Sequence, residues 1–289
     1  MKQIQLIASD LDGTLLTSKK EVTPRLYQVL ETLHHMGIHF VPATGRPFGS
    51  LPQDIRNLPF LKYVITSNGA SIYDAENQET LLRNLLSPET VEITLSVAKK
   101  LPVLTEFFLD GHAYIAQKAF ENLSSYGLTE SHIHYIRTTR TPVEDFWGTI
   151  ERQKANLENI NLVFQDMELR KETLALLREK GHASVTASSS KNIEITSPEA
   201  TKSKALATLC HRLDIDPIHT LALGDSDNDL PMLQFAGVGI AMANGEAHIK
   251  AAADRIADDC NSFGAAKILE EIIAQKGYYR ENHTINKGV

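Results

Sequence analysis

The stretch Asp10-Leu11-Asp12-Gly13-Thr14 directly follows an apolar run, residues 4–8, which predicts a buried strand. Side chains alternate along an extended chain with a period of two, so carboxylates at positions i and i+2 point the same way. Like charges this close are unfavourable unless one is protonated or a cation lies between them. The pair therefore predicts a divalent metal site, although the same five residues also fit a solvated turn.

The composition of the chain limits the classes of protein to which it can belong. Its 289 residues predict two domains, or one domain with an insertion, and a hydrophobic content of 42% is ordinary for a folded core. The net charge of −7 argues against a nucleic-acid partner. Cys210 and Cys260 lack the spacing of a metal site and are expected to be free thiols. No run approaches about eighteen apolar residues, and the first strand begins too early for a secretory signal, so we expect a cytoplasmic protein with no membrane partner.

Apolar runs alternate with helical stretches in the first and last parts of the chain. Thr23 and Pro24 are typical of a helix start, and Gly37 is typical of a helix end. The predicted strands are residues 4–8, 38–43, 63–66, 220–223, 238–242 and 255–257, and the other predicted helices lie near 205–213 and 263–274. This alternation with buried strands predicts a parallel sheet of the α/β class.

The middle of the chain has a different pattern. Asp110-Gly111 lies between two β-prone runs, residues 105–109 and 112–116, and this predicts a hairpin. Polar helical stretches are expected around residues 141–153 and 166–180. The mixture predicts an inserted α+β domain over residues 85–189, which divides the core domain into residues 1–84 and 190–289.

Two positively charged or donor-rich clusters are candidates for binding an anion. Ligands of open α/β sheets bind beyond the carboxyl ends of the strands. Thr44-Gly45-Arg46 follows a predicted strand, where a hydroxyl and a bare glycine backbone supply hydrogen-bond donors. Lys202 begins a predicted helix, whose N-terminus already favours anions, whereas Lys204 is expected to be solvated.

An acidic cluster, Gly224-Asp225-Ser226-Asp227-Asn228-Asp229, follows the predicted strand at residues 220–223. A calcium-binding EF-hand loop that starts at Asp225 would have Leu230 in place of its glycine and Ala236 in place of its glutamate, so that hypothesis fails. An acidic turn that completes a magnesium site with Asp10 and Asp12 fits better.

These four motifs, in this order, resemble those of haloacid dehalogenase (HAD) superfamily phosphatases of the Cof type, which belong to class IIB and carry a C2B cap. Asn68-Gly69-Ala70 and Met242-Ala243-Asn244 also resemble accessory sequences of that family. The resemblance covers essentially the whole chain, with the cap matched by position and size, and Ser203 departs from the glycine that relatives often carry. It implies a HAD-like Rossmannoid core with a parallel sheet and an inserted α+β cap domain.

The resemblance also implies roles for individual residues. Asp10 would be the nucleophile that forms an aspartyl-phosphate, and Asp12 would protonate the leaving alcohol and then activate water. Mg²⁺ would be held by the Asp10 carboxylate, the Asp12 main-chain carbonyl and Asp225. The residues that would contact the phosphate are Leu11, Thr44, Gly45, Lys202 and Asn228, and those that would orient them are Arg46 and Asp229. Asp229 would orient Lys202 or the ligands of the metal rather than touch it.

The resemblance implies a small phosphorylated metabolite as the substrate, such as a sugar phosphate, FMN or pyridoxal phosphate. Residues around Glu106 to His112, or near Tyr126-Gly127, would then set specificity. A phosphomutase or a non-catalytic phosphate-binding regulator is the alternative. Receiver domains also carry a phosphorylated aspartate, but they lack an acid two residues later, so Asp12 favours turnover.

Overall fold

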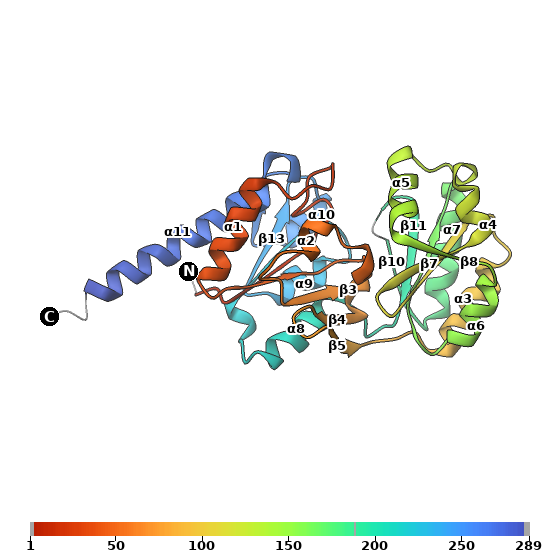
Figure 1. Cartoon of the computed structure of the whole chain (residues 1–289), viewed down its shortest axis with the longest axis horizontal. Helices are drawn as coiled ribbons and strands as arrows, with labels where there is room; N and C mark the ends of the chain where they lie inside the picture. Colours follow the sequence, from red (N-terminus) through yellow and green to blue (C-terminus); the bar gives the residue numbers. More distant parts are fainter. Residues whose placement is uncertain (1–2, 188, 286–289) are drawn as a thin grey trace. The chain divides into compact units, whose positions relative to one another are not determined.

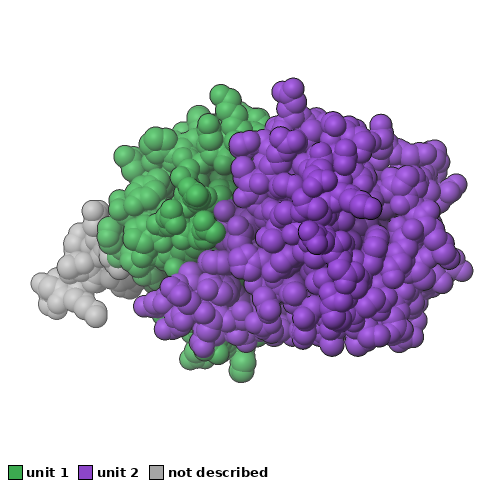
Figure 2. Space-filling model, turned by 45° about the vertical axis from the view of Figure 1, so that its right-hand side comes forward, with its two compact units in different colours: residues 1–43, 52–64, 206–289 green, residues 44–51, 65–205 purple. Residues whose placement is uncertain are grey.

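The computed structural model describes residues 3–187 and 189–285 of the chain (Figure 1). The chain divides into two compact units (Figure 2). Unit 1 comprises residues 1–43, 52–64 and 206–289, and unit 2 comprises residues 44–51 and 65–205. The predicted domain limits of 1–84, 85–189 and 190–289 remain a prediction.

Unit 1 contains a parallel sheet of five strands in the order β14-β13-β12-β1-β2. Its strands are β1 (Leu6–Ser9), β2 (His39–Pro42), β12 (Thr220–Gly224), β13 (Val238–Met242) and β14 (Arg255–Ala257). Every residue of β1 and β12 is buried, as expected for central strands of a parallel sheet with both faces covered. The predicted α/β fold class is confirmed.

The first helix shows how local sequence sets the limits of an element in unit 1. Thr23 accepts a hydrogen bond from the Leu26 amide, so it caps α1 (Pro24–His35) as predicted. Gly37 follows the helix with a φ of +71°, a conformation that glycine adopts without strain. The other α-helices of unit 1 are α2 (Gln53–Arg56), α9 (Leu230–Phe235), α10 (Ala247–Ala252) and α11 (Gly264–Ile285). The helix α8 (Lys202–Arg212) begins in unit 2 and continues into unit 1. Among the described residues, no helix combines the length and apolar character needed to cross a membrane.

The third predicted strand lies in a different sheet from the one expected. β3 (Tyr63–Thr66) has the predicted limits, but it belongs to a three-stranded sheet with β4 (Ser71–Asp74) and β5 (Glu79–Arg83). The expectation that it extends the parallel sheet was therefore wrong. Local composition predicts that an apolar segment is a strand, but which strand it pairs with depends on residues far away in the sequence.

Unit 2 contains a sheet of six strands in the order β10-β11-β9-β6-β7-β8, in which only the β7–β8 pair is parallel. The strands are β6 (Leu104–Leu109), β7 (His112–Ala116), β8 (Arg140–Val143), β9 (Leu157–Val163), β10 (Ser184–Thr186) and β11 (Asn192–Thr196). The predicted hairpin is present, and Asp110 and Gly111 both have a positive φ at its turn.

The helices of unit 2 agree only in part with the sequence pattern. They are α3 (Pro88–Ala98), α4 (Gln117–Glu121), α5 (Glu130–Thr139), α6 (Phe146–Gln153) and α7 (Met167–Lys180). The helix predicted around residues 141–153 was wrong over its first part, because Arg140–Val143 is the strand β8. The helix begins only after Asp145, whose carboxylate accepts from the Gly148 amide and caps it.

The two faces of the six-stranded sheet differ in polarity. One face packs Phe107, Ile160, Leu162 and Ile193 into an apolar core with residues of α3, α6 and α7. The opposite face carries a polar row, in which Glu106, Asn161 and Glu194 are in register on three neighbouring strands. All three are buried. Part of this face is covered by a smaller apolar cluster that includes Leu104, Ile115, Ile136 and Val163.

Candidate active site

Three carboxylates gather at the ends of two neighbouring strands of unit 1. Asp10 follows β1 and donates its amide to the Leu223 carbonyl of β12 at 2.9 Å, so the two strand ends lie side by side. Among the described residues, carboxylate oxygens of Asp10, Asp225 and Asp229 lie within 4.8 Å of one another. Asp10 and Asp229 are buried, and Asp225 is half-buried.

The side chain of Asp229 closes the turn after β12 through hydrogen bonds to the main chain. Its Oδ2 accepts hydrogen bonds from the amides of Asp225 and Ser226 at 3.0 and 3.1 Å. A Cβ at Gly224 would lie 2.4 Å from the Cβ of Asp229, so only glycine fits where the turn closes. Asp229 thus orients the main chain that carries Asp225, while its own carboxylate remains part of the three-membered group.

The loop after β1 packs against the side chain of Asp225. Gly13 has a φ of +86°, and a Cβ at this position would lie 2.5 Å from Asp225 Oδ2. Thr14 donates its hydroxyl to Asp225 Oδ1 at 3.3 Å. Gly13 and Thr14 therefore allow the loop after β1 to pack closely against the loop that carries Asp225.

Asn244 is a further residue of this cluster, to which the sequence assigned no role. Its amide nitrogen donates to the Gly13 carbonyl at 2.8 Å and to Asp225 Oδ2 at 3.3 Å, and its Oδ1 accepts from the Cys260 amide. The signal was present in the sequence, because Asn244 lies just after β13, the neighbour of β12.

The second acid of the first motif lies at the edge of this group. Asp12 forms an ion pair with Lys20 at 2.7 Å, and its side chain is about one-third exposed. Its carboxylate is not a member of the group formed by Asp10, Asp225 and Asp229 among the described residues. The Leu11 side chain is buried, so its main chain is the part that could contact a phosphate.

The Thr44-Gly45-Arg46 motif lies in unit 2 as a tight turn. Thr44 donates its amide to the Ile65 carbonyl, and its hydroxyl accepts from the Arg46 amide at 3.2 Å. A Cβ at Gly45 would lie 3.1 Å from Asn68 Oδ1. Arg46 donates to the Ser50 carbonyl at 3.0 Å, and its guanidinium lies 4.6 Å from the centre of the Tyr135 ring.

Lys202 is the inward-facing lysine at the start of α8. It is only 1% exposed, whereas the side chain of Lys204 is 50% exposed and pairs with Glu199 at 3.0 Å. Gly69 packs against this helix start, because a Cβ there would lie 2.2 Å from the Thr201 carbonyl oxygen. The two lysines thus differ in burial, and which of them faces a ligand stays a prediction.

The predicted residues therefore fall into two groups. Asp10, Asp225 and Asp229 are gathered in unit 1, where Leu11, Asp12 and Asn228 belong to the same two loops. Thr44, Gly45, Arg46 and Lys202 belong to unit 2.

The donor set in unit 1 fits a divalent metal. Carboxylate oxygens are hard ligands of the kind that Mg²⁺ and Ca²⁺ prefer. Three carboxylates within 4.8 Å, two of them buried, repel one another unless a cation or a proton compensates their charge. The hydrogen bonds from Thr14 and Asn244 point Asp225 toward this group without neutralising it.

The fold and the acidic cluster together define a hydrolase class. A sequence model of the haloacid dehalogenase-like hydrolase family matches residues 7–269, and the chain belongs to this family. It is similar to 5-amino-6-(5-phospho-D-ribitylamino)uracil phosphatase YcsE of Bacillus subtilis, at 26% identity over 92% of this chain and 94% of that protein.

Solved structures agree with this assignment. A haloacid dehalogenase-like hydrolase from B. subtilis is 27% identical and covers 92% of this chain and 99% of its own, with a TM-score of 0.82. The fold is also that of the HAD subclass IIB sugar phosphatase BT4131, which is 21% identical over 92% of this chain and 98% of its own, with a TM-score of 0.77. The chain is thus a phosphatase of the HAD family.

Proposed function

We propose that this phosphatase is Mg²⁺-dependent and hydrolyses small phosphorylated metabolites through an aspartyl-phosphate formed on Asp10. The observation that carries the proposal is the gathering of the Asp10, Asp225 and Asp229 carboxylates at the ends of β1 and β12. Cys210 and Cys260 are free thiols, which supports the proposal of a reducing, cytoplasmic location.

The proposed metal ligands are the Asp10 carboxylate, the Asp12 main-chain carbonyl and Asp225. When bound, Mg²⁺ would compensate the charge of the carboxylates and of the phosphate, so that two anions can approach each other. Asp229, Thr14 and Asn244 would hold the loop of Asp225 in place through the hydrogen bonds described above.

The proposed chemistry takes place in two steps on this chain's own residues. The Asp10 carboxylate attacks phosphorus, and the bond to the ester oxygen breaks as Asp12 donates a proton to the leaving alcohol. Asp12, now ionised, then takes a proton from water, and the water oxygen displaces Asp10 to release inorganic phosphate. The Leu11 and Gly45 main chain, Thr44, Lys202 and Asn228 would hold the phosphoryl oxygens and stabilise their charge in the transition state.

Release of inorganic phosphate from a panel of esters tests this proposal. The panel contains sugar phosphates, FMN, pyridoxal phosphate and p-nitrophenyl phosphate, each assayed with Mg²⁺, with EDTA, and with EDTA followed by excess Mg²⁺. We expect EDTA to abolish activity and Mg²⁺ to restore it. Full activity after exhaustive chelation would contradict the proposal, and phosphoryl transfer to a sugar hydroxyl in place of water would show a mutase.

A further inference from the structure

A lysine in the loop after β1 forms an ion pair with the second acid of the first motif. Lys20 Nζ lies 2.7 Å from a carboxylate oxygen of Asp12. The two side chains are 49% and 32% exposed, so the pair lies at the surface of unit 1. An exposed ion pair contributes little to stability, so folding alone is not a sufficient reason for this one.

The main chain at Lys20 has a conformation that disfavours lysine. Its φ is +65°, in the left-handed region where any side chain beyond that of glycine is crowded. The Lys20 amide donates to the Thr17 carbonyl at 2.8 Å, so Lys20 is the last residue of a four-residue turn, a position where glycine is common. If residue 20 served only the turn, glycine would serve it with less strain. The lysine therefore indicates a role for its side chain.

The loop that carries this ion pair is held by two asparagine side chains from elsewhere in unit 1. Near the start of the loop, the Gly13 carbonyl accepts from the Asn244 amide group at 2.8 Å. Near its end, the Ser18 amide donates to Asn261 Oδ1 at 3.0 Å. These contacts do not involve the Lys20 side chain, so the loop is expected to keep its shape when that side chain is replaced.

The ion pair also accounts for where the Asp12 carboxylate lies. Asp10 and Asp12 are two positions apart, and along an extended chain both side chains would point toward the same ligand. Among the described residues, however, the Asp10 carboxylate is grouped with Asp225 and Asp229, while that of Asp12 lies against Lys20. A carboxylate that serves as a metal ligand is engaged by the cation and is not available for proton transfer. Keeping Asp12 apart from the group is thus a condition for its proposed role as acid and base.

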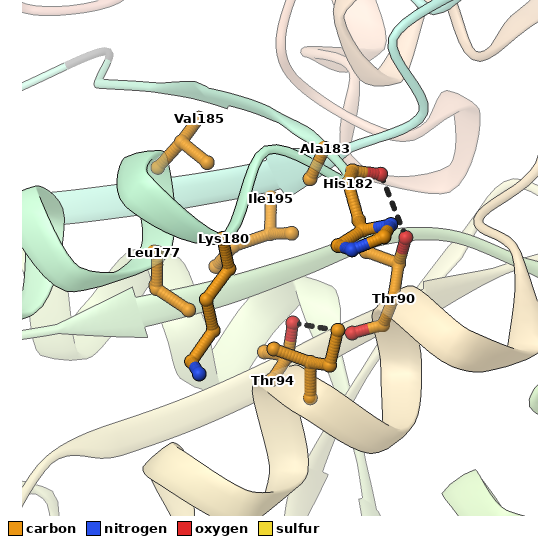
Figure 3. Close-up of a pocket in the computed structure, with 9 residues that line it drawn as sticks. Thr90, Thr94, Leu177, Lys180, His182, Ala183, Val185 and Ile195 are labelled. Atoms are coloured by element: carbon orange, nitrogen blue, oxygen red, sulfur yellow. Dashed lines mark hydrogen bonds between the residues drawn. The ribbon is translucent and has the colours of Figure 1, made fainter.

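A cavity in unit 2 shows the contrasting case, in which polar side chains have a structural use (Figure 3). Most of the residues that line it are apolar. The Thr90 hydroxyl donates to the His182 carbonyl and the Thr94 hydroxyl to the Thr90 carbonyl, each at 2.8 Å. Both hydroxyls therefore stabilise the main chain around them, whereas Lys20 contacts the side chain of a proposed catalytic residue.

We infer that Lys20 is a positioning residue, which holds the Asp12 carboxylate apart from the proposed metal ligands and so keeps it available for proton transfer. This inference rests on the proposed phosphatase function, and Lys20, Asp12 and the three grouped acids all belong to unit 1. The ammonium group supplies the charge that compensates Asp12, so the two acids of the motif have separate cationic partners. Without the Lys20 charge, the Asp12 carboxylate would be attracted to the bound metal instead.

Substitutions at Lys20 can separate its charge from its backbone conformation. Lys20→Met removes the charge and keeps the length, Lys20→Arg keeps the charge, and Lys20→Gly removes the charge while relieving the strained φ. Lys19→Met is the matched control, because Lys19 is the neighbouring lysine and is also exposed. Lys20→Met is also combined with Asp12→Asn, since a residue that acts through Asp12 has no further effect once that acid is removed.

Three quantities are measured for each variant. The first is the single-turnover rate of ester cleavage, with p-nitrophenyl phosphate and with the alkyl ester that the wild type hydrolyses fastest. The second is the dissociation constant of Mn²⁺ without substrate, which reports on the acids independently of catalysis. The third is the melting temperature.

Lys20→Met should lower the cleavage rate of the alkyl ester about ten- to a hundredfold, because proton donation by Asp12 is impaired. The rate for p-nitrophenyl phosphate should fall less than about threefold, since its leaving group needs little protonation. Mn²⁺ should bind about three- to tenfold more tightly, because a further carboxylate reaches the metal. Lys20→Met should cause no further loss in the Asp12→Asn background.

The other variants should separate the charge from the turn. Lys20→Gly should match Lys20→Met in both cleavage rates, with an unchanged or higher melting temperature, because the strain at residue 20 is relieved. Lys20→Arg and Lys19→Met should stay close to the wild type in cleavage and in Mn²⁺ binding.

Four results would overturn the inference while leaving the phosphatase function intact. Unchanged or equally reduced cleavage of the two esters by Lys20→Met would mean that Lys20 does not serve proton donation, and unchanged Mn²⁺ binding would mean that it does not keep Asp12 from the metal. Near wild-type cleavage by Lys20→Gly would reduce residue 20 to a turn position. A full additional loss in the Asp12→Asn background would show that Lys20 does not act through Asp12.

If Lys20→Met does not fold, Lys20→Gly decides by the same measurements. Failure of the proposed function itself has a different signature. Inactivity of the wild type on every ester, p-nitrophenyl phosphate included, would contradict the phosphatase proposal and the inference with it.

Discussion

The two large sheets of the molecule hold their polar groups in different places. In unit 1 the parallel sheet is buried through its central strands, and its carboxylates lie in the loops just beyond β1 and β12. In unit 2 the six-stranded sheet is apolar on one face, while the other face carries Glu106, Asn161, Glu194 and their neighbours. In unit 1 apolar side chains fill both faces of the central strands, so the polar side chains lie at the strand ends. In unit 2 the polar face is buried as well, and its charges are paired, as Glu106 is with Arg140.

Substitutions are therefore expected to have different effects at the strand ends of unit 1 and on the polar sheet face of unit 2. Residues at strand ends are consecutive in sequence and form a catalytic motif as a block. Residues on a sheet face alternate with core residues, so a substitution there changes one ligand contact or one buried ion pair at a time. We therefore expect substitutions in the first region to act on the reaction itself, and substitutions in the second to act on selectivity or stability.

The largest effect is expected for Asp10→Asn, which should abolish turnover, because an amide is neither a nucleophile nor a strong metal ligand. The matched control is Asp227→Asn in the acidic turn after β12, since Asp227 is exposed and its carboxylate pairs with His248. Steady-state phosphate release measures both variants. A near wild-type rate for Asp10→Asn would contradict the assignment of the nucleophile.

Asp12→Asn should lower kcat by about 10²–10⁴-fold, because it removes a general acid and base. The first step should suffer less with p-nitrophenyl phosphate, whose leaving group needs little protonation, than with an alkyl ester. Single-turnover kinetics with both esters measures the difference. An equal loss of the first-step rate for the two esters would argue against proton donation by Asp12.

On the sheet face, Glu106→Gln should destabilise the fold by about 3–5 kcal/mol, because it leaves the buried Arg140 charge without its partner. Burial opposes ionisation of Glu106, but the charge and hydrogen bonds of Arg140, with help from Asn161, keep its pKa below its ordinary value. The stabilisation is therefore present above the ordinary pKa and is lost as the pH falls through the lowered one.

Denaturant unfolding across pH measures this effect, with Arg152→Gln as the control for an exposed ion pair. The wild type and Glu106→Gln should differ most near neutral pH and converge in acid. A difference that does not shrink in acid would show that the loss comes from packing and not from the ion pair.

Lys202→Met should lower kcat/KM by about 10²–10³-fold if the buried lysine stabilises the transferring phosphoryl group. Lys204→Met at the same helix start is the matched control and should stay close to wild type, because that side chain is exposed. Equal effects of the two substitutions would remove Lys202 from the proposed site.

The comparison also explains what the sequence could predict. The acids after β1 and β12, the Thr44 turn and Lys202 each follow a recognisable strand or begin a helix, so contiguous motifs identified them. Asn244 lacked a role because its contacts join three loops that are far apart in the sequence: it donates to Gly13, 231 positions away, and to Asp225, 19 positions away. Thr23 and Gly37 were correct because helix caps are local features.

The sheet of unit 2 was less predictable because its contacts are long-range. The hairpin at Asp110-Gly111 was predicted, and alternation along its first strand places Phe107 and Phe108 on opposite faces. In the structure Phe107 packs in the apolar core and Phe108 lies on the other face, beside Arg140. Asn68 pairs with Glu194 across 126 positions, and Arg140 pairs with Glu106 across 34. Such register depends on strand order, which the local sequence does not contain.

The central claim is that Asp10 carries the phosphoryl group during turnover, and trapping this intermediate tests it most directly. The enzyme is mixed with Mg²⁺ and a rapidly hydrolysed ester, quenched within one turnover, reduced with borohydride and digested for mass spectrometry. Reduction of an aspartyl-phosphate yields homoserine, which we predict at position 10 and at no other acid, and only when both Mg²⁺ and ester are present. Homoserine at another aspartate, or an unmodified Asp10 under conditions of steady phosphate release, would contradict the account.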